Sequence, residues 1–143
     1  MRTPKSNLKS WDIALWTAQI VLAAMFIMAS LPKTLTPIQE LAATMPLAAE
    51  VPEALVRFIG ISELLAAIGL VLPGVFRIKP QLISVAAAGL VVIMVLAILY
   101  HLAKGEIVPA GINVVLGLLA AFVAWGRFSK APLSAGSRST IQG

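Results

Sequence analysis

Apolar residues are grouped along the chain into four long runs, and short segments rich in charged residues and proline separate them. An α-helix needs about 20 residues to cross the apolar core of a bilayer. The runs are close to this length and predict membrane-spanning helices at about residues 11–31, 53–72, 81–103 and 109–125. Because the connections are short, the pattern predicts an all-α integral membrane protein, a four-helix antiparallel bundle.

The first connection has a pattern of its own. After Pro37, apolar residues recur at helical spacing as far as Met45. This spacing, in a segment with polar residues on its other face, is typical of an amphipathic helix that lies on the membrane surface. We therefore expect a short interfacial helix in the first outer loop.

The basic residues indicate how the bundle is oriented. Eight of the 11 lysine and arginine residues lie before the first helix, in the second connection or after the fourth helix. Lysine and arginine are enriched in cytoplasmic loops. This distribution predicts a multi-pass protein of the bacterial cytoplasmic (inner) membrane with both termini in the cytoplasm. Residues 1–128 form the predicted domain, and the polar segment 129–143 is expected to be a disordered cytoplasmic tail.

The composition supports a membrane protein and excludes several kinds of chemistry. Charged residues make up 12% of the chain, whereas soluble domains have about 25%. The formal net charge of +5 comes from helix ends, without a basic patch interleaved with aromatic residues, so we expect no nucleic-acid partner. There is no cysteine and only one histidine. The chain therefore has no thiolate metal site, iron–sulfur cluster or bis-histidine haem site of its own, and no metal site is predicted.

Glu63 lies within the apolar run Phe58–Leu70. A carboxylate in such a segment must be paired, protonated or hydrated, and ionisable residues inside membranes are often functional. If this helix enters from the outer side, Glu63 lies about 9 Å deeper than Arg57, at 1.5 Å per residue. Glu63 is therefore the centre of the predicted site, although a structural carboxylate bonded to neighbouring helices would follow the same pattern.

Four other polar residues are expected near Glu63. With alternating helix directions, all of them fall in the outer half of the membrane: Lys33, Tyr100, His101 and Asn113. We expect Glu63 and Asn113 to meet inside the bundle, below a mouth formed by the other three. Each also has a plainer interpretation: a snorkelling lysine, an aromatic-belt tyrosine and an interfacial histidine, and an asparagine that bonds another helix.

The segment Phe58–Pro73, FIGISELLAAIGLVLP, resembles the FIG-x-x-E-L-L-G-A-x-G-L-x-L-P segment of the DoxX-like membrane proteins. Two further stretches resemble the same family. Tyr100–Glu106 resembles the end of its third helix, and Ile112–Leu116 together with Gly126–Phe128 resembles its fourth helix. The chain departs from the pattern near Lys33, because Thr34 separates it from Leu35 where the family often has Lys-Leu. The resemblance extends over about residues 13–128.

The resemblance implies a four-helix membrane protein of the DoxX superfamily, whose members include a subunit similar to part of a thiosulfate:quinone oxidoreductase. Our leading hypothesis is an accessory protein, without a catalytic motif of its own, that holds a lipophile or a partner helix in an outer-leaflet cavity centred on Glu63. Its partners would be the lipid bilayer and a membrane protein or a second copy of the chain.

Two alternatives stay open. The first is a quinone-linked membrane oxidoreductase subunit, in which quinone is the cofactor and Glu63 and His101 exchange protons with it. The second is a small proton-coupled transporter, which would need an oligomer because four helices leave little room for alternating access. The sequence identifies no catalytic residue, so whether the protein is an enzyme is left open.

Overall fold

The computed structural model describes residues 5–136, apart from the side chain of Ser6. Four long helices dominate this part of the chain: α1 (Lys5–Leu35), α4 (Glu53–Phe76), α5 (Gln81–Ala103) and α6 (Ile107–Trp125). All four are long and apolar enough to cross a membrane. The described residues contain no strand. The predicted all-α, four-helix membrane architecture is confirmed.

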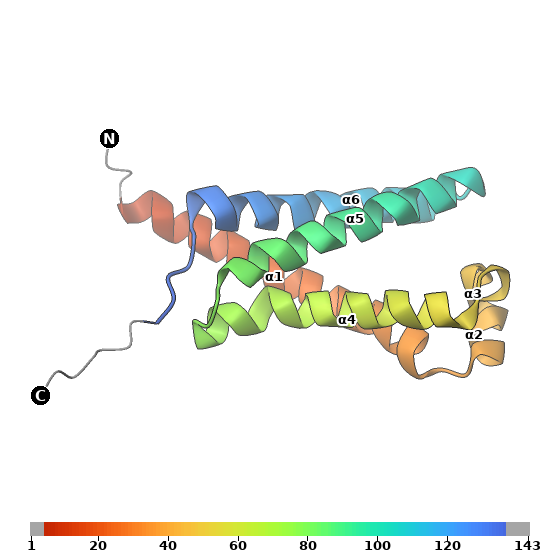
Figure 1. Cartoon of the computed structure of the whole chain (residues 1–143). Helices are drawn as coiled ribbons and strands as arrows, with labels where there is room; N and C mark the ends of the chain where they lie inside the picture. The colour runs from red at the N-terminus through yellow and green to blue at the C-terminus, as the bar shows by residue number, and fades with distance from the viewer. Residues whose placement is uncertain (1–4, 137–143) are drawn as a thin grey trace, which may run out of the picture.

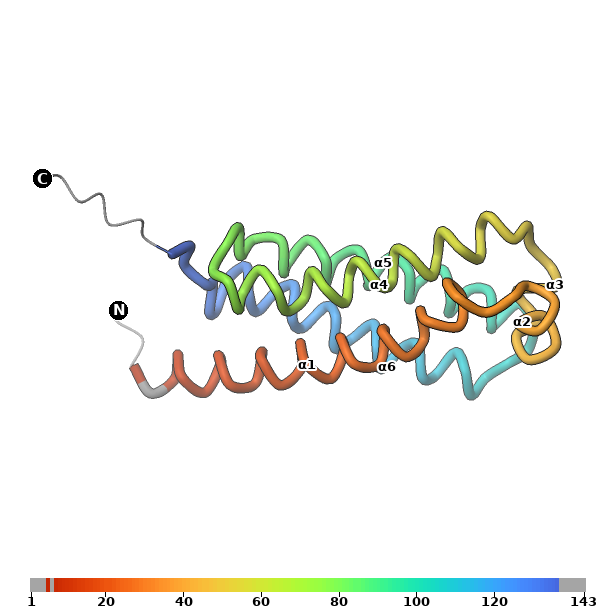
Figure 2. Tube along the Cα trace, turned by 90° about the horizontal axis from the view of Figure 1, so that it is seen from below, coloured from red at the N-terminus to blue at the C-terminus, as the bar shows by residue number. Residues whose placement is uncertain are grey.

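The four helices alternate in direction along the bundle (Figure 1). α1 packs against α4 and α6, and α5 packs against the same two helices, so the four form a closed ring. The described chain begins and ends at one end of the bundle, here called the terminal end, as Figure 2 also shows. The short helices α2 (Ile38–Thr44) and α3 (Pro46–Glu50) lie at the opposite end, here called the α2–α3 end.

All four long helices contribute to the core. Its buried residues include Leu22 and Phe26 of α1, Leu70 of α4, Leu90 of α5 and Val123 of α6. The outward faces are apolar as well, with large exposed side chains such as Ile20, Met28, Leu65, Val85 and Leu118. An apolar exterior around a bundle is what contact with lipid chains requires, because lipid offers no hydrogen bonds to polar groups.

α4 and α5 approach most closely near the terminal end. A Cβ atom added to Gly69 would lie 2.9 Å from the Cβ of Ala86, so the backbones are closer here than any larger residue would allow. Small residues at such crossings stabilise helix association in membranes. Towards the α2–α3 end the two helices diverge (Figure 1).

Three of the long helices extend beyond their predicted ranges. α1 begins at Lys5 and ends at Leu35, α4 continues to Phe76, and α6 begins at Ile107. The apolar pattern marks the part of a helix that suits hydrocarbon, whereas helical hydrogen bonding continues into polar residues until the backbone changes conformation. In α4 that change comes at Arg77, which adopts a left-handed conformation with a φ of 53°.

The first connection contains two short helices where one was expected. The break falls at Met45, whose backbone is extended with a φ of −128° and a ψ of 102°. A residue before proline disfavours the helical conformation, and Pro46 follows Met45. Leu41 and Ala48, one from each short helix, are buried against Val56 of α4. The connection is therefore docked on the bundle.

The chain stays close to the bundle for several residues after α6. Gly126–Lys130 continues the helix as a π-helical turn. Ala131 is buried, and the backbone N–H of Gly136 donates to the carbonyl of Arg77 at 3.0 Å. Ala131 and Gly136 therefore contact the bundle, and the disorder expected from residue 129 onward stays a prediction. The rest of the predicted tail, residues 137–143, lies outside the described residues.

Candidate functional site

Glu63 forms an ion pair with Lys33 across the α1–α4 crossing. The Nζ of Lys33 lies 2.7 Å from Oε2 of Glu63, and the two side chains are 13% and 4% exposed. The helices cross closely because position 60 is glycine: a Cβ atom on Gly60 would lie 2.7 Å from the Cβ of Lys33. A lysine and a glutamate in an apolar surrounding each lower the cost of burying the other.

The backbone of Lys33 is held as firmly as its side chain. Its carbonyl has no helical partner at Pro37, because proline lacks an N–H group. Nη1 of Arg57 donates to this carbonyl at 2.9 Å instead. The same guanidinium donates from Nε and Nη2 to Oε1 of Glu53, at 3.1 and 2.9 Å. Arg57 therefore fixes the end of α1 to α4 and sets the position from which Lys33 reaches Glu63.

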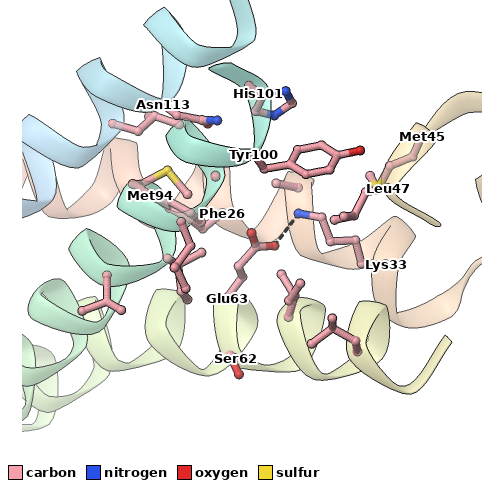
Figure 3. Close-up of a pocket in the computed structure, with 18 of the residues that line it drawn as sticks. Phe26, Lys33, Met45, Leu47, Ser62, Glu63, Met94, Tyr100, His101 and Asn113 are labelled. Atoms are coloured by element: carbon pink, nitrogen blue, oxygen red, sulfur yellow. Dashed lines mark hydrogen bonds and ion pairs between the residues drawn. The ribbon is translucent and has the colours of Figure 1, made fainter. Parts of the chain in front are cut away.

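A cavity of about 710 Å³ lies beside this ion pair. Its walls are mainly apolar. Phe26 and Met94, both buried, line it on the side of the core, and Met45 and Leu47 line it on the side of α2 and α3. Figure 3 shows the carboxylate of Glu63 directed into the space between these groups. The cavity therefore combines an apolar interior with a single buried ion pair.

Tyr100 connects α5 with α3. Its hydroxyl donates to Oε2 of Glu50 at 2.9 Å, and Nζ of Lys104 lies 2.6 Å from Oε1 of the same carboxylate. These hydrogen bonds, first that from Lys104 and then that from Tyr100, lower the pKa of Glu50. The hydrogen bond to Glu50 raises the pKa of Lys104. We call Glu50, Tyr100 and Lys104 the α3–α5 clasp, because they hold α3 against the end of α5 beside the cavity.

His101 and Asn113 both line the cavity, but only the side chain of His101 has a hydrogen-bond partner in the described part of the chain. Nδ1 of His101 lies 2.6 Å from Oε2 of Glu106, and both residues face the cavity. Asn113 also lines the cavity, and its side chain makes no hydrogen bond with any residue in the range 5–136. Its amide therefore offers two donors and one acceptor to whatever occupies the cavity.

The structure thus places all five residues of the predicted site around one cavity: Lys33, Glu63, Tyr100, His101 and Asn113. Lys33 turns inward, because Gly60 lets α1 come close enough to pair it with Glu63, so the plainer interpretation of a snorkelling lysine does not apply. Glu63 and Asn113 line the same cavity but make no hydrogen bond with each other. That these residues bind a ligand stays a prediction.

Sequence reasoning missed the carboxylates that bond the site residues. Glu106 pairs with His101 across a tight turn in which Gly105 has a φ of 73°. The sequence could have predicted this pair, because Glu106 follows His101 by five residues and a helix-ending glycine lies between them. Glu50, by contrast, meets Tyr100 from 50 residues away, and no local pattern indicates such a contact.

A second polar cluster closes the bundle at the terminal end. Arg127, only 4% exposed, donates from Nε to Oε1 of Gln19 and from Nη1 to Oδ1 of Asp12, both at 2.6 Å. Its guanidinium lies over the ring of Trp16 at 5.4 Å. Nε2 of Gln19 in turn donates to the carbonyl of Leu70. The spacing of seven residues between Asp12 and Gln19, which share one helix face, was the available signal.

An antiparallel bundle of four apolar helices, with a buried ion pair beside an internal cavity, defines a multi-pass integral membrane protein. The sequence model of the DoxX-like family matches residues 17–123 of this chain, a range that includes every residue of the predicted site. The chain belongs to the DoxX-like family. No curated protein and no solved structure matches it significantly.

Proposed function

We propose that this DoxX-like protein is an accessory membrane protein that binds a small lipophile in the cavity beside Glu63. The observation that carries the proposal is a cavity of about 710 Å³ with apolar walls and few polar groups, lined mainly by membrane-spanning helices. Pockets for small molecules in proteins have volumes of about 300–1,000 Å³ and the same mixture of apolar walls and a few polar groups.

The unpaired polar atoms in the cavity support a ligand. Oε1 of Glu63 and the amide of Asn113 have no hydrogen-bond partner among residues 5–136. Unsatisfied polar groups are costly in hydrocarbon, because no water is present to bond them. Hydrogen bonds to a ligand head group would remove that cost and would fix how deep the ligand lies.

We further propose that the α2–α3 end is the outer end, with both termini in the cytoplasm of a bacterial inner membrane. The charges at the two ends of the bundle support this orientation. Basic residues near the terminal end include Lys9, Arg77 and Lys130. The α2–α3 end has most of the acidic residues instead: Glu40, Glu50, Glu53 and Glu106.

A quinone-linked oxidoreductase subunit is the second candidate. One observation favours it: His101 and Glu63, two groups that can exchange protons, line the same cavity. A quinone head group has two carbonyl oxygens that such groups could bond. The electrons would have to come from another subunit, which makes an associated redox protein a requirement of this candidate.

The test is native mass spectrometry with lipid extraction on protein purified from its own membranes. We would compare the wild type with Lys33→Met/Glu63→Leu, which removes both charges together, and with Glu40→Gln, which changes an exposed carboxylate away from the cavity. The wild type and Glu40→Gln should carry the same lipophile, and the double variant should lose it. A wild type without any lipophile, or a double variant that retains it, would contradict the proposal. A quinone in the extract would favour the second candidate.

A further inference from the structure

Each carboxylate that lines the cavity is bonded to a basic side chain. Lys33 lies 2.7 Å from Glu63, and His101 lies 2.6 Å from Glu106. An anionic head group would therefore find no free cation and would lie near two carboxylates. A cationic head group at the remaining oxygen of Glu63 would lie beside the ammonium of Lys33. In a surrounding of low dielectric constant both arrangements are unfavourable.

The hydrogen-bonding groups of the cavity are of both kinds. Oε1 of Glu63 accepts only, the ammonium of Lys33 has N–H donors beyond the one that it gives to Glu63, and the amide of Asn113 does both. A hydroxyl group donates one hydrogen bond and accepts two. An uncharged head with a hydroxyl or a comparable donor–acceptor group therefore suits this set better than a charged head or a plain hydrocarbon.

The cavity reaches the lipid-facing surface between α4 and α5. These helices touch at Gly69 and Ala86 and diverge towards the α2–α3 end. Four residues in the divergent part both line the cavity and are largely exposed on the outside: Leu55 (43%), Phe58 (67%), Val92 (60%) and Leu96 (62%). All four are apolar and belong to membrane-spanning helices. The medium outside this opening is therefore lipid chains.

We propose that the cavity takes an uncharged lipophile with a hydrogen-bonding head, of the chemistry of a long-chain alcohol, and that this ligand enters sideways from the bilayer between α4 and α5. The head lies at Glu63 and Asn113, and the chain extends through the opening beside Phe58 and Leu96. The inference rests on the proposed function and specifies its ligand class and entry route.

The ligand class is tested with probes that share one chain and differ in the head. Hexadecanol, hexadecyl methyl ether, hexadecyl sulfate and hexadecyltrimethylammonium are titrated into the wild-type protein, and bound adducts are counted by native mass spectrometry. Hexadecanol should bind most tightly, the ether about tenfold more weakly because it cannot donate a hydrogen bond, and both ions roughly a hundredfold more weakly.

A charged probe that binds as tightly as hexadecanol overturns this inference but leaves lipophile binding intact. Failure of every probe, with no native lipophile present, contradicts the proposed function itself.

The entry route is tested by blocking the opening. The chain has no cysteine, so a bulky maleimide can be attached at Leu96→Cys alone. Val85→Cys is the matched control, because Val85 lies on the same helix, is 64% exposed and does not line the cavity. The modified Leu96→Cys protein should take up hexadecanol about tenfold more slowly, or slower still, with little change at the control position. Equal uptake rates for the two modified proteins would exclude entry between α4 and α5.

Discussion

Lys33 and Glu63 depend on each other energetically, because each would be an uncompensated charge in a largely apolar surrounding without the other. Breaking such a buried pair by removing one partner costs about 3–5 kcal/mol, whereas replacing both partners with apolar residues is often neutral. Lys33→Met and Glu63→Leu should therefore each destabilise the bundle by about 3–5 kcal/mol, and the double variant should regain most of that loss. Reversible unfolding in mixed detergent micelles measures this. Additive losses in the double variant would show that the two charges are not coupled.

Gly60 sets the distance across which this pair forms. Gly60→Ala should destabilise the protein by about 1–3 kcal/mol, because the new methyl group would overlap with Lys33 and force α1 and α4 apart. Gly89→Ala is the matched control, since nothing lies within 4 Å of a Cβ atom at that position. That change should stabilise α5 by up to about 1 kcal/mol through helix propensity. The same unfolding assay compares the two variants, and equal effects would contradict the close crossing.

The hydrogen bonds of the α3–α5 clasp depend on pH. Because the pKa of Glu50 is lowered from its ordinary value of 4.5, the clasp is fully formed above that pH and is lost as pH falls through the lowered pKa. Because the pKa of Lys104 is raised from 10.5, the clasp persists at higher pH until that raised pKa is passed. The clasp should therefore hold across the neutral range and release in acid.

Spin labels at Ala49→Cys on α3 and Leu99→Cys on α5 can measure this release by double electron–electron resonance. The distance distribution should be narrow near neutral pH and broaden once the pH falls below the lowered pKa of Glu50. In a Glu50→Gln background it should already be broad at neutral pH and should not respond to acid. A narrow distribution under all these conditions would show that other contacts hold α3.

The helices themselves could be predicted well from the sequence, since a run of about 20 apolar residues has few alternatives in a membrane protein. Their alternating directions also placed the five residues of the site at one end. What could not be predicted is which polar groups pair. The inward turn of Lys33 depends on how closely α1 approaches Gly60, and the burial of Arg127 depends on a π-helical turn after α6. Both are results of packing between helices, which the pattern along one helix does not contain.

The whole bundle should have one orientation in the membrane, because its two ends differ in charge. We expect Ala43→Cys, on α2, to react with a membrane-impermeant maleimide added outside intact spheroplasts. Ser134→Cys, near the terminal end, should react only after the membrane is permeabilised. Both residues are exposed in the folded protein, so accessibility reports on the side of the membrane. The reverse pattern of labelling would mean that the α2–α3 end faces the cytoplasm.

In the proposed function, a lipophile occupies the cavity and bonds the polar groups beside Glu63. The chain has only two asparagines. Asn7 lies near the terminal end of the bundle, and Asn113 lines the cavity. Selective ¹⁵N-asparagine labelling therefore gives two side-chain amide signals, one of which is an internal control. On titration with hexadecanol, the Asn113 amide should shift progressively to saturation while Asn7 stays in place. If both amides stay in place at saturating hexadecanol, or both shift alike, the cavity does not hold the ligand at this position.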